Sequence, residues 1–124
     1  MKKGESSMLV YVAGPLTVGN KTQNVRRAIN AGEKIASKGH SVFIPHLFEL
    51  WELIYHHDYE FWMKLDIVIL KKCDILVRLP GYSKGSDREL GLAKQFGLLT
   101  FGDVHINGLI EFMNSKYWCQ TDQH

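Results

Sequence analysis

Short apolar segments that end in Gly or Pro alternate along this chain with segments of helical periodicity. The apolar segments are rich in Val, Ile and Leu, as strands buried on both faces of a sheet are. They are MLVYVAG (8–14), SVFIP (41–45), DILVRLP (74–80) and LLTFG (98–102). Helices are expected over 20–37, 59–72, 86–96 and 106–117. The alternation predicts an α/β fold, a doubly wound parallel sheet (flavodoxin- or Rossmann-like) of about four to five strands with helices on both faces.

The chain is expected to form one domain over residues 8–124, after a flexible leader at 1–7. Its length of 124 residues suits a single hydrophobic core. The stretch HLFELWELIYHHD (46–58) is aromatic and irregular, and we expect a loop with a helical turn there.

Composition excludes several classes of function. A net charge of +2 is too small to indicate a nucleic-acid-binding surface. No apolar run approaches the ~18 residues of a membrane span, and the first residues do not read as a signal peptide. Cys73 and Cys119 lie far apart without a Cys-x-x-Cys motif, which favours free thiols in the cytoplasm.

The loops that follow the predicted strands are where chemistry is expected. In a sheet of this kind, ligands bind outside the carboxyl ends of the strands. These loops are AGPLTVGN (13–20), PHLFELW (45–51), PGYSKGSDRE (80–89) and GDVHIN (102–107).

Glu89, in the third of these loops, has two interpretations. Ser86 and Glu89 have the S-x-x-E spacing of a capping box, which would make Glu89 a structural residue at a helix start. Alternatively, Glu89 lies where the loops converge and acts as a nucleophile or base over a bound ligand. The two interpretations are compatible with each other.

Asp66 is the second carboxylate of interest. On a helix its neighbours three and four residues away are all apolar: Trp62, Met63, Ile69 and Leu70. Poor solvation there would raise its pKa, as proton donation to a leaving group requires. The alternative is an exposed Asp at a helix edge near Lys64. One carboxylate at a polar loop and one among apolar residues form the pair that glycosidic chemistry uses.

The first loop matches neither G-x-G-x-x-G nor the phosphate loop ending in Gly-Lys-Ser/Thr, which argues against a dinucleotide or a triphosphate. It offers a turn at Gly14 and Pro15, the Thr17 hydroxyl and the Asn20 amide for a sugar or small anion. Either Asn20 or Thr22 could be the helix N-cap.

Ser83, Gly85 and Ser86 place hydroxyls and backbone N–H groups at the start of another helix. They suit a phosphate group, although ordinary turn chemistry explains them equally well.

No metal site is expected, because His56 and His57 are adjacent and no His-Glu-x-x-His motif occurs. Phe48, Trp51, Phe61 and Trp62 are expected to line the core or a pocket, and some of them could stack on a base.

Several motifs in order resemble one family. They are Tyr11-x-Ala13-Gly14-Pro15, Gly39-His40-x-x-Phe43-x-Pro45, Asp66-x6-Cys73-Asp74 and Leu79-Pro80-Gly81-x-Ser83-x-Gly85-x3-Glu89-x3-Ala93-x3-Gly97. Over residues 9–101 the chain resembles the nucleoside 2-deoxyribosyltransferase superfamily. That superfamily includes the 2'-deoxynucleoside 5'-monophosphate N-glycosidases and the CMP hydrolases of antibiotic pathways. The chain is most similar to its short members of unassigned function.

The resemblance implies a retaining N-glycosidase or glycosyltransferase that acts on a (deoxy)nucleoside or its 5'-monophosphate and needs no cofactor. Glu89 would be the nucleophile, Asp66 would assist departure of the base, and Tyr11 would orient Glu89. Ser83 would bind a 5'-phosphate. The whole substrate-binding set would be Gly14, Pro15, Thr17, Asn20, His46, Gly81, Ser83, Gly85 and Ser86.

The sequence also departs from the family pattern. The monophosphate hydrolases have a Ser and an Arg in the first loop, where this chain has Pro15 and Thr17, and Arg78 or Arg88 could substitute for that Arg. The acidic residue that the transferases have just before the Glu loop is replaced by Leu-Pro-Gly at 79–81. In the family, C-terminal residues of one subunit often complete the neighbour's site, so the tail KYWCQTDQH implies a homodimer or larger homo-oligomer.

Two other functions remain open at this point. One is a non-catalytic module that binds and senses a nucleotide, and the other is a flavodoxin-like domain in which Glu89 is only a cap.

Overall fold

The computed structural model of the chain describes residues 7–102, 108, 109 and 111. The leader apart from Ser7, the tail KYWCQTDQH and all but three residues of the helix expected over 106–117 lie outside the described residues.

The strands form one parallel sheet, and its strand order is β2-β1-β3-β4. β1 (Leu9–Ala13) pairs with β2 (Ser41–Phe43) on one side and with β3 (Ile75–Arg78) on the other. β4 (Leu99–Gly102) extends the sheet beyond β3. The predicted α/β fold is therefore confirmed, with four strands in the described part of the chain.

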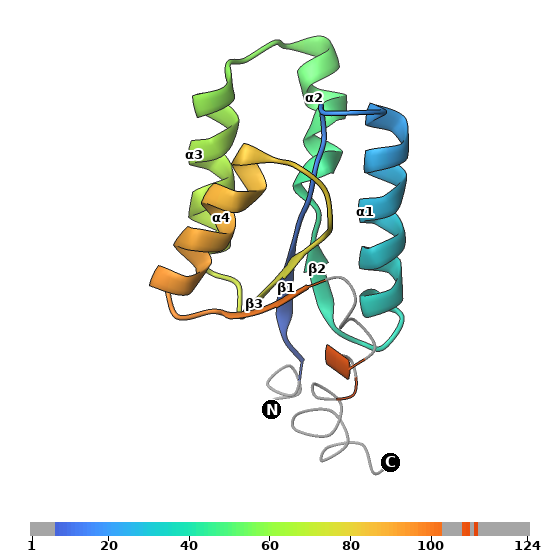
Figure 1. Cartoon of the computed structure of the whole chain (residues 1–124), viewed down its shortest axis with the longest axis vertical. Helices are drawn as coiled ribbons and strands as arrows, with labels where there is room; N and C mark the ends of the chain where they lie inside the picture. Colours follow the sequence, from blue (N-terminus) through green and yellow to red (C-terminus); the bar gives the residue numbers. More distant parts are fainter. Residues whose placement is uncertain (1–6, 103–107, 110, 112–124) are drawn as a thin grey trace.

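Helices cover both faces of this sheet. α1 (Lys21–Ala36) lies on one side, and α3 (Tyr59–Leu70) and α4 (Lys84–Gln95) lie together on the other (Figure 1). The segment expected as a loop with a helical turn forms the 3-10 helix η2 (Pro45–Phe48) followed by α2 (Glu49–Ile54). None of the helices in the described residues is long and apolar enough to cross a bilayer.

Alternation along β1 decides which side chains face which helices. Val10 and Val12 pack in the core cluster that contains Ala28 and Ile35 of α1. Tyr11 belongs to the other cluster, with Leu70 of α3 and Ala93 of α4. Because successive strand side chains point to opposite faces, Tyr11 lies under the helices that carry the two predicted carboxylates.

Asn20 is the N-cap of α1, and its side chain accepts a hydrogen bond from Gln23 N at 2.9 Å. Of the two candidate caps for this helix, Asn20 is therefore the correct one, and Thr22 lies inside the helix.

The capping box predicted for Ser86 and Glu89 is wrong. The N-cap of α4 is Ser83, whose Oγ accepts a hydrogen bond from Ser86 N at 3.1 Å. The helix starts earlier than expected because Gly81 adopts φ +112 and Ser83 is extended at φ −163. Glu89 consequently lies beyond the first turn and is not an N-terminal cap.

Candidate functional site

Tyr11 and Glu89 form the centre of the site. The Tyr11 hydroxyl donates a hydrogen bond to Glu89 Oε2 at 2.5 Å, linking β1 to α4 across 78 residues of sequence. Tyr11 is fully buried and Glu89 is only 5% exposed. Burial strongly raises the pKa of Tyr11, and the neighbouring Glu89 carboxylate raises it further, so the hydroxyl keeps its proton.

Asp66, on α3, is the third member of this group. It is 8% exposed, so the alternative of an exposed Asp at a helix edge is wrong. Its Oδ1 is one of two buried side-chain atoms in the described residues that lack a hydrogen-bond partner. Burial raises the pKa of Asp66 to about 8, and the nearby Glu89 carboxyl contributes to the increase.

The two carboxyls therefore differ in their surroundings. Burial raises the pKa of Glu89 as well, but hydrogen bonding from Tyr11 and the charges of Arg78 and Arg88 act in the opposite direction. No cation in the described part of the chain lowers the pKa of Asp66 in the same way. These surroundings favour the protonated form more strongly at Asp66 than at Glu89.

A cavity of about 540 Å³ opens over these carboxyls, within the range of small-molecule sites. Both Asp66 and Glu89 line it. The predicted substrate-binding residues that also line it are Gly14, Thr17, His46, Ser83, Gly85 and Ser86. The carboxyl ends of β1, β2 and β3 thus converge on one pocket, as the topology predicts.

The other predicted substrate-binding residues lie outside the lining. Asn20 is engaged as the cap of α1. Pro15 and Gly81 contact each other instead, since a Cβ on Gly81 would lie 2.8 Å from Pro15 Cγ. They hold the loops after β1 and β3 together. Tyr11 lies beneath the pocket and acts on it through Glu89.

Arg78 and Arg88 are not placed to receive a phosphate in this pocket. Neither lines it. Arg88 forms an ion pair with Glu60 of α3 at 2.9 Å, and Arg78 binds the turn that follows β3 and Asp87 of α4. The expectation that one of them takes the place of the family's phosphate-binding Arg is not supported.

His46 is buried, at 3% exposure, and its ring connects two loops. Its Nε2–H donates to the carbonyl oxygen of Pro15 at 3.1 Å, while Nδ1 has no partner among the described residues. Burial lowers the pKa of His46, so its ring is neutral at neutral pH. This tautomer leaves a bare acceptor nitrogen beside the pocket.

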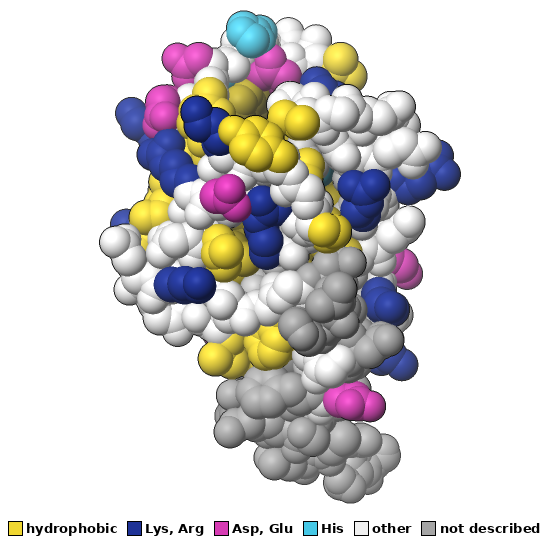
Figure 2. Space-filling model, viewed as in Figure 1, with side chains coloured by type: hydrophobic (Ala, Val, Ile, Leu, Met, Phe, Trp, Pro, Cys, Tyr) yellow, Lys and Arg dark blue, Asp and Glu magenta, His cyan; other side chains and the backbone are white. Residues whose placement is uncertain are grey.

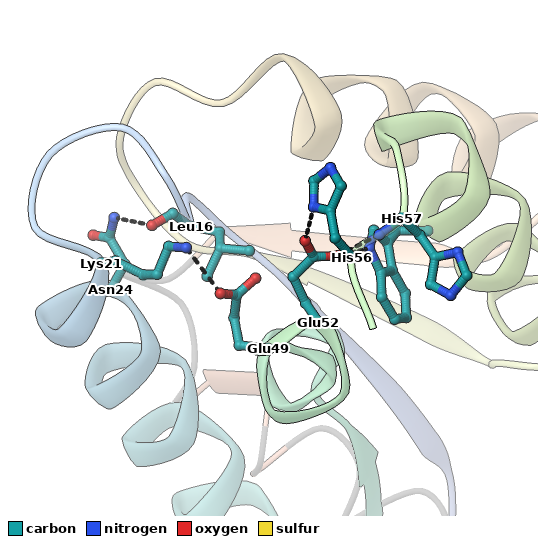
Figure 3. Close-up of polar contacts among 8 residues, drawn as sticks. Leu16, Lys21, Asn24, Glu49, Glu52, His56 and His57 are labelled. Atoms are coloured by element: carbon teal, nitrogen blue, oxygen red, sulfur yellow. Dashed lines mark hydrogen bonds and ion pairs between the residues drawn. The ribbon is translucent and has the colours of Figure 1, made fainter. Parts of the chain in front are cut away.

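Part of the pocket wall consists of charged residues that the sequence did not single out. Figure 3 shows Lys21, at the start of α1, pairing with Glu49 of α2, and the distance is 2.8 Å. In the same view Asn24 donates to the carbonyl of Leu16, which fixes the loop after β1.

Glu52 anchors the aromatic part of this wall. It accepts hydrogen bonds from Trp62 Nε1 at 2.6 Å and from the backbone N–H of His57 at 3.1 Å, and it also contacts His56 (Figure 3). These bonds lower the pKa of Glu52 to about 2. Phe48 and Trp62 stack with ring centroids 5.5 Å apart, and both line the pocket. The aromatic residues were expected at a pocket, whereas Lys21, Glu49 and Glu52 gave no signal because their charges look like those of any helix surface.

Positive charge is not concentrated on the face of the molecule that Figure 2 shows. On the face shown in Figure 2, the Lys and Arg side chains of the described residues are spread among hydrophobic ones rather than gathered into one basic patch. Among the described residues, no group of three or more His, Cys, Asp or Glu side chains is arranged to hold a metal ion.

Both a solved structure and a family model match this chain. The chain resembles the solved structure of a 2-deoxyribosyltransferase from the psychrotolerant bacterium Bacillus psychrosaccharolyticus. The identity is 25%, the TM-score is 0.56, and the match covers 76% of this chain and 72% of that one. Comparison with curated proteins finds no match. A family model described as "Domain of unknown function (DUF4406)" matches residues 8–101, which include every residue of the site above. Because this match spans most of the 124 residues, the chain belongs to the DUF4406 family.

Proposed function

We propose that this protein is an enzyme that cleaves or transfers the N-glycosidic bond of a (deoxy)nucleoside or its 5'-monophosphate. The observation that carries the proposal is the buried Tyr11–Glu89 hydrogen bond at 2.5 Å, with Asp66 beside it under the pocket. The similarity to a 2-deoxyribosyltransferase supports the class of reaction.

In the first step the Glu89 carboxylate attacks the anomeric carbon of the sugar. A C–O bond to Glu89 forms while the bond from the sugar to the base nitrogen breaks, and that electron pair stays on the base. Asp66 gives its proton to the departing base. Its raised pKa keeps this proton available at neutral pH.

In the second step water or a second base attacks the same carbon, and the bond to Glu89 breaks. Asp66, now a carboxylate, accepts the proton that the attacking group loses. Glu89 returns to its ionised form, in which Tyr11 again donates to it. Two displacements at one carbon retain its configuration.

The remaining lining suits the other parts of such a substrate. Phe48 and Trp62 supply an aromatic wall for the base. Ser83, Gly85 and Ser86 lie at the start of α4, where hydroxyls and the helix terminus suit the 5' end of the sugar or its phosphate. The proposed mechanism uses only protein side chains. The buried free thiol of Cys73 supports a reducing compartment such as the cytoplasm.

We also propose that a second copy of the chain covers the outer surface of η2 and α2. The exposed apolar side chains there are Leu47, Leu50, Trp51, Leu53, Ile54 and Tyr55. Leu50, Leu53 and Ile54 have the spacing of one helix face. Each of the six is at least 41% exposed, so the apolar surface that a partner could cover is continuous along η2 and α2.

Both carboxylates of α2 have bonding partners within the same chain. Glu49 is paired with Lys21, and Glu52 accepts hydrogen bonds from Trp62 and His57. Lys21 therefore offsets the charge of Glu49 on this surface, while Glu52 is held by hydrogen bonds within the same chain. Since Phe48, Glu49 and Glu52 also line the pocket, this interface would lie beside the site.

The test of the proposed reaction is release of free base. The purified protein is incubated with ribo- and deoxyribonucleosides and their 5'-monophosphates, with and without a second base, and the products are separated by HPLC. We expect base release by wild type and a loss of about 1,000-fold or more in Glu89→Gln. Glu33→Gln, which removes an exposed carboxylate of α1 outside the pocket lining, is the control and should keep its activity.

The other outcomes of this experiment are equally informative. A new nucleoside in the presence of the second base indicates transfer, and free sugar indicates hydrolysis. No release from any substrate, together with thermal stabilisation by one of them, would contradict the proposal and favour a nucleotide-binding sensor.

A further inference from the structure

Arg78, the last residue of β3, makes an unusual set of contacts for a residue outside the pocket. Its Nη1 donates to the carbonyl oxygen of Leu79 at 2.5 Å. Its Nη2 donates to the carbonyl oxygen of Gly81 at 3.0 Å and to Asp87 Oδ1 at 2.8 Å. The Arg78 side chain is only 16% exposed, although its partner Asp87 is 64% exposed.

The three acceptors belong to consecutive parts of one connection. Leu79 and Gly81 lie in the turn after β3, and Asp87 lies in the first turn of α4. One planar guanidinium therefore joins the end of the strand, the turn and the helix. An ammonium group is a point donor and cannot reproduce this fork of bonds.

The connection that Arg78 holds carries the functional side chains. Ser83, the N-cap of α4, follows Gly81 by two residues, and Glu89 follows Asp87 by two residues. The backbone of this turn is unusual, since Gly81 has φ +112. Gly81 also packs against Pro15 of the first loop.

The charge of Arg78 also acts on Glu89. The groups that influence the Glu89 carboxyl come from each element packed around it: Tyr11 of β1, Asp66 of α3, Arg78 of β3 and Arg88 of α4 itself. Arg78 and Arg88 both lower the pKa of Glu89. Arg78 does so from a less exposed position, at 16% against 41% for Arg88.

We propose that Arg78 is a positioning residue, which fixes the turn at 79–83 and the first turn of α4 and holds a positive charge at the start of the helix that carries Glu89. It touches no ligand, since it does not line the pocket. The proposal relies on the proposed function only for the statement that Glu89 reacts.

Two measurements on the free protein test it without any substrate. The first is hydrogen exchange of the amides of Ser86 and Asp87, which bond to Ser83 Oγ and Ser83 O. The second is the pH titration of the Glu89 carboxyl by carbon-13 NMR, assigned with Glu89→Gln. Arg78→Lys keeps the charge and loses the fork, Arg78→Gln loses both, and Arg88→Gln removes a charge without touching the turn.

We expect exchange of these two amides to be at least about tenfold faster in both Arg78 variants and unchanged in Arg88→Gln. We expect the Glu89 titration to move to higher pH in Arg78→Gln and to stay near that of wild type in Arg78→Lys. A folded Arg78→Lys with wild-type exchange rates would overturn the positioning role, and an unshifted titration in Arg78→Gln would overturn the electrostatic one.

Turnover supplies a separate readout. If base release is observed, kcat should fall about tenfold or more in Arg78→Lys with little change in KM, because the substrate contacts remain. An unchanged kcat would contradict the proposal. If wild type releases no base, the proposed function fails, while the exchange and titration results still decide the role of Arg78.

Discussion

At the scale of single residues, the site depends on where one proton resides. The Tyr11 hydroxyl donates to Glu89, and a donated hydrogen bond favours the ionised carboxylate. Asp66 has a buried oxygen without a partner, and burial favours its neutral form. Two carboxylic acids in contact with one pocket thus differ in protonation through their environment alone, as the proposed roles of nucleophile and acid require.

Replacing Asp66 by Asn should change stability in a pH-dependent way. The pKa of Asp66 rises from its ordinary value of 3.8 to about 8 on folding, so the folded state holds more protons than the unfolded state between these values. Wild-type stability therefore falls as pH increases through this window. Asp66→Asn cannot titrate and avoids this loss. We expect the free energy of unfolding of Asp66→Asn, relative to that of wild type, to be about 2 kcal/mol higher at pH 8.5 than at pH 4.5.

Urea denaturation at both pH values measures this difference. Glu33→Gln, which alters an exposed carboxylate of α1, is the control and should follow wild type within about 0.5 kcal/mol. An equal stability difference at both pH values would mean that Asp66 does not titrate with a raised pKa.

Tyr11→Phe should act on Glu89 without adding or removing charge. Loss of the donated hydrogen bond raises the pKa of Glu89, since the ionised form loses its donor. The acidic limb of the pH profile of kcat/KM should shift to higher pH, and activity at pH 6 should fall by about tenfold. Phe43→Leu, at the ring that packs 5.5 Å from Tyr11, tests packing alone and should leave the limb in place. An identical acidic limb in Tyr11→Phe would argue against an orienting role.

At the scale of elements, the site requires close contact between the loops after β1 and β3. A Cβ on Gly14 would lie 2.9 Å from Leu79 Cβ, and one on Gly81 would lie 2.8 Å from Pro15 Cγ. Gly81 also has φ +112, where a side chain is strained. Gly14 is therefore needed for space, and Gly81 is needed both for space and for its backbone conformation.

Three alanine substitutions separate these effects. Gly91→Ala, inside α4 with free space around it, should stabilise the protein by about 0.5–1 kcal/mol. Gly97→Ala has φ +85 but no neighbour within 4 Å, so it should cost about 1 kcal/mol from backbone strain. Gly81→Ala adds the contact with Pro15 and should cost about 1 kcal/mol more than Gly97→Ala. Thermal denaturation ranks the three, and equal losses at positions 81 and 97 would show that the loops can separate freely.

At the scale of the whole molecule, the apolar surface of α2 should control association. Leu53→Glu places a charge at the most exposed of its leucines and should raise the dissociation constant of a homodimer by about 100-fold or more. Val68→Glu, at an exposed apolar position on α3, is the matched control. Sedimentation equilibrium measures both, and a wild type that stays monomeric at high concentration would exclude this interface.

Local pattern was enough to predict the layers of this fold. Hydrophobic periodicity is a local property, and it marks apolar runs around Val10, Val42, Val77 and Phe101 with helical segments between them. A parallel sheet covered by helices buries all four apolar runs. The candidates at strand ends followed from topology. Local pattern did not predict the start of α4 correctly. Ser83 and Ser86 are both good N-caps, and only the conformation of Gly81 and Ser83 selects between them.

The sequence by itself determined the parallel α/β architecture and the set of loops that follow the carboxyl ends of the strands, because hydrophobic periodicity is encoded locally. Only the tertiary structure decided that Tyr11 meets Glu89 across 78 residues, that Asp66 is buried beside them, and that Arg78 bonds to the turn after β3 and lies outside the pocket lining. The physical reason is that pKa values and hydrogen bonds depend on burial and on partners distant in sequence, and folding alone brings those partners together.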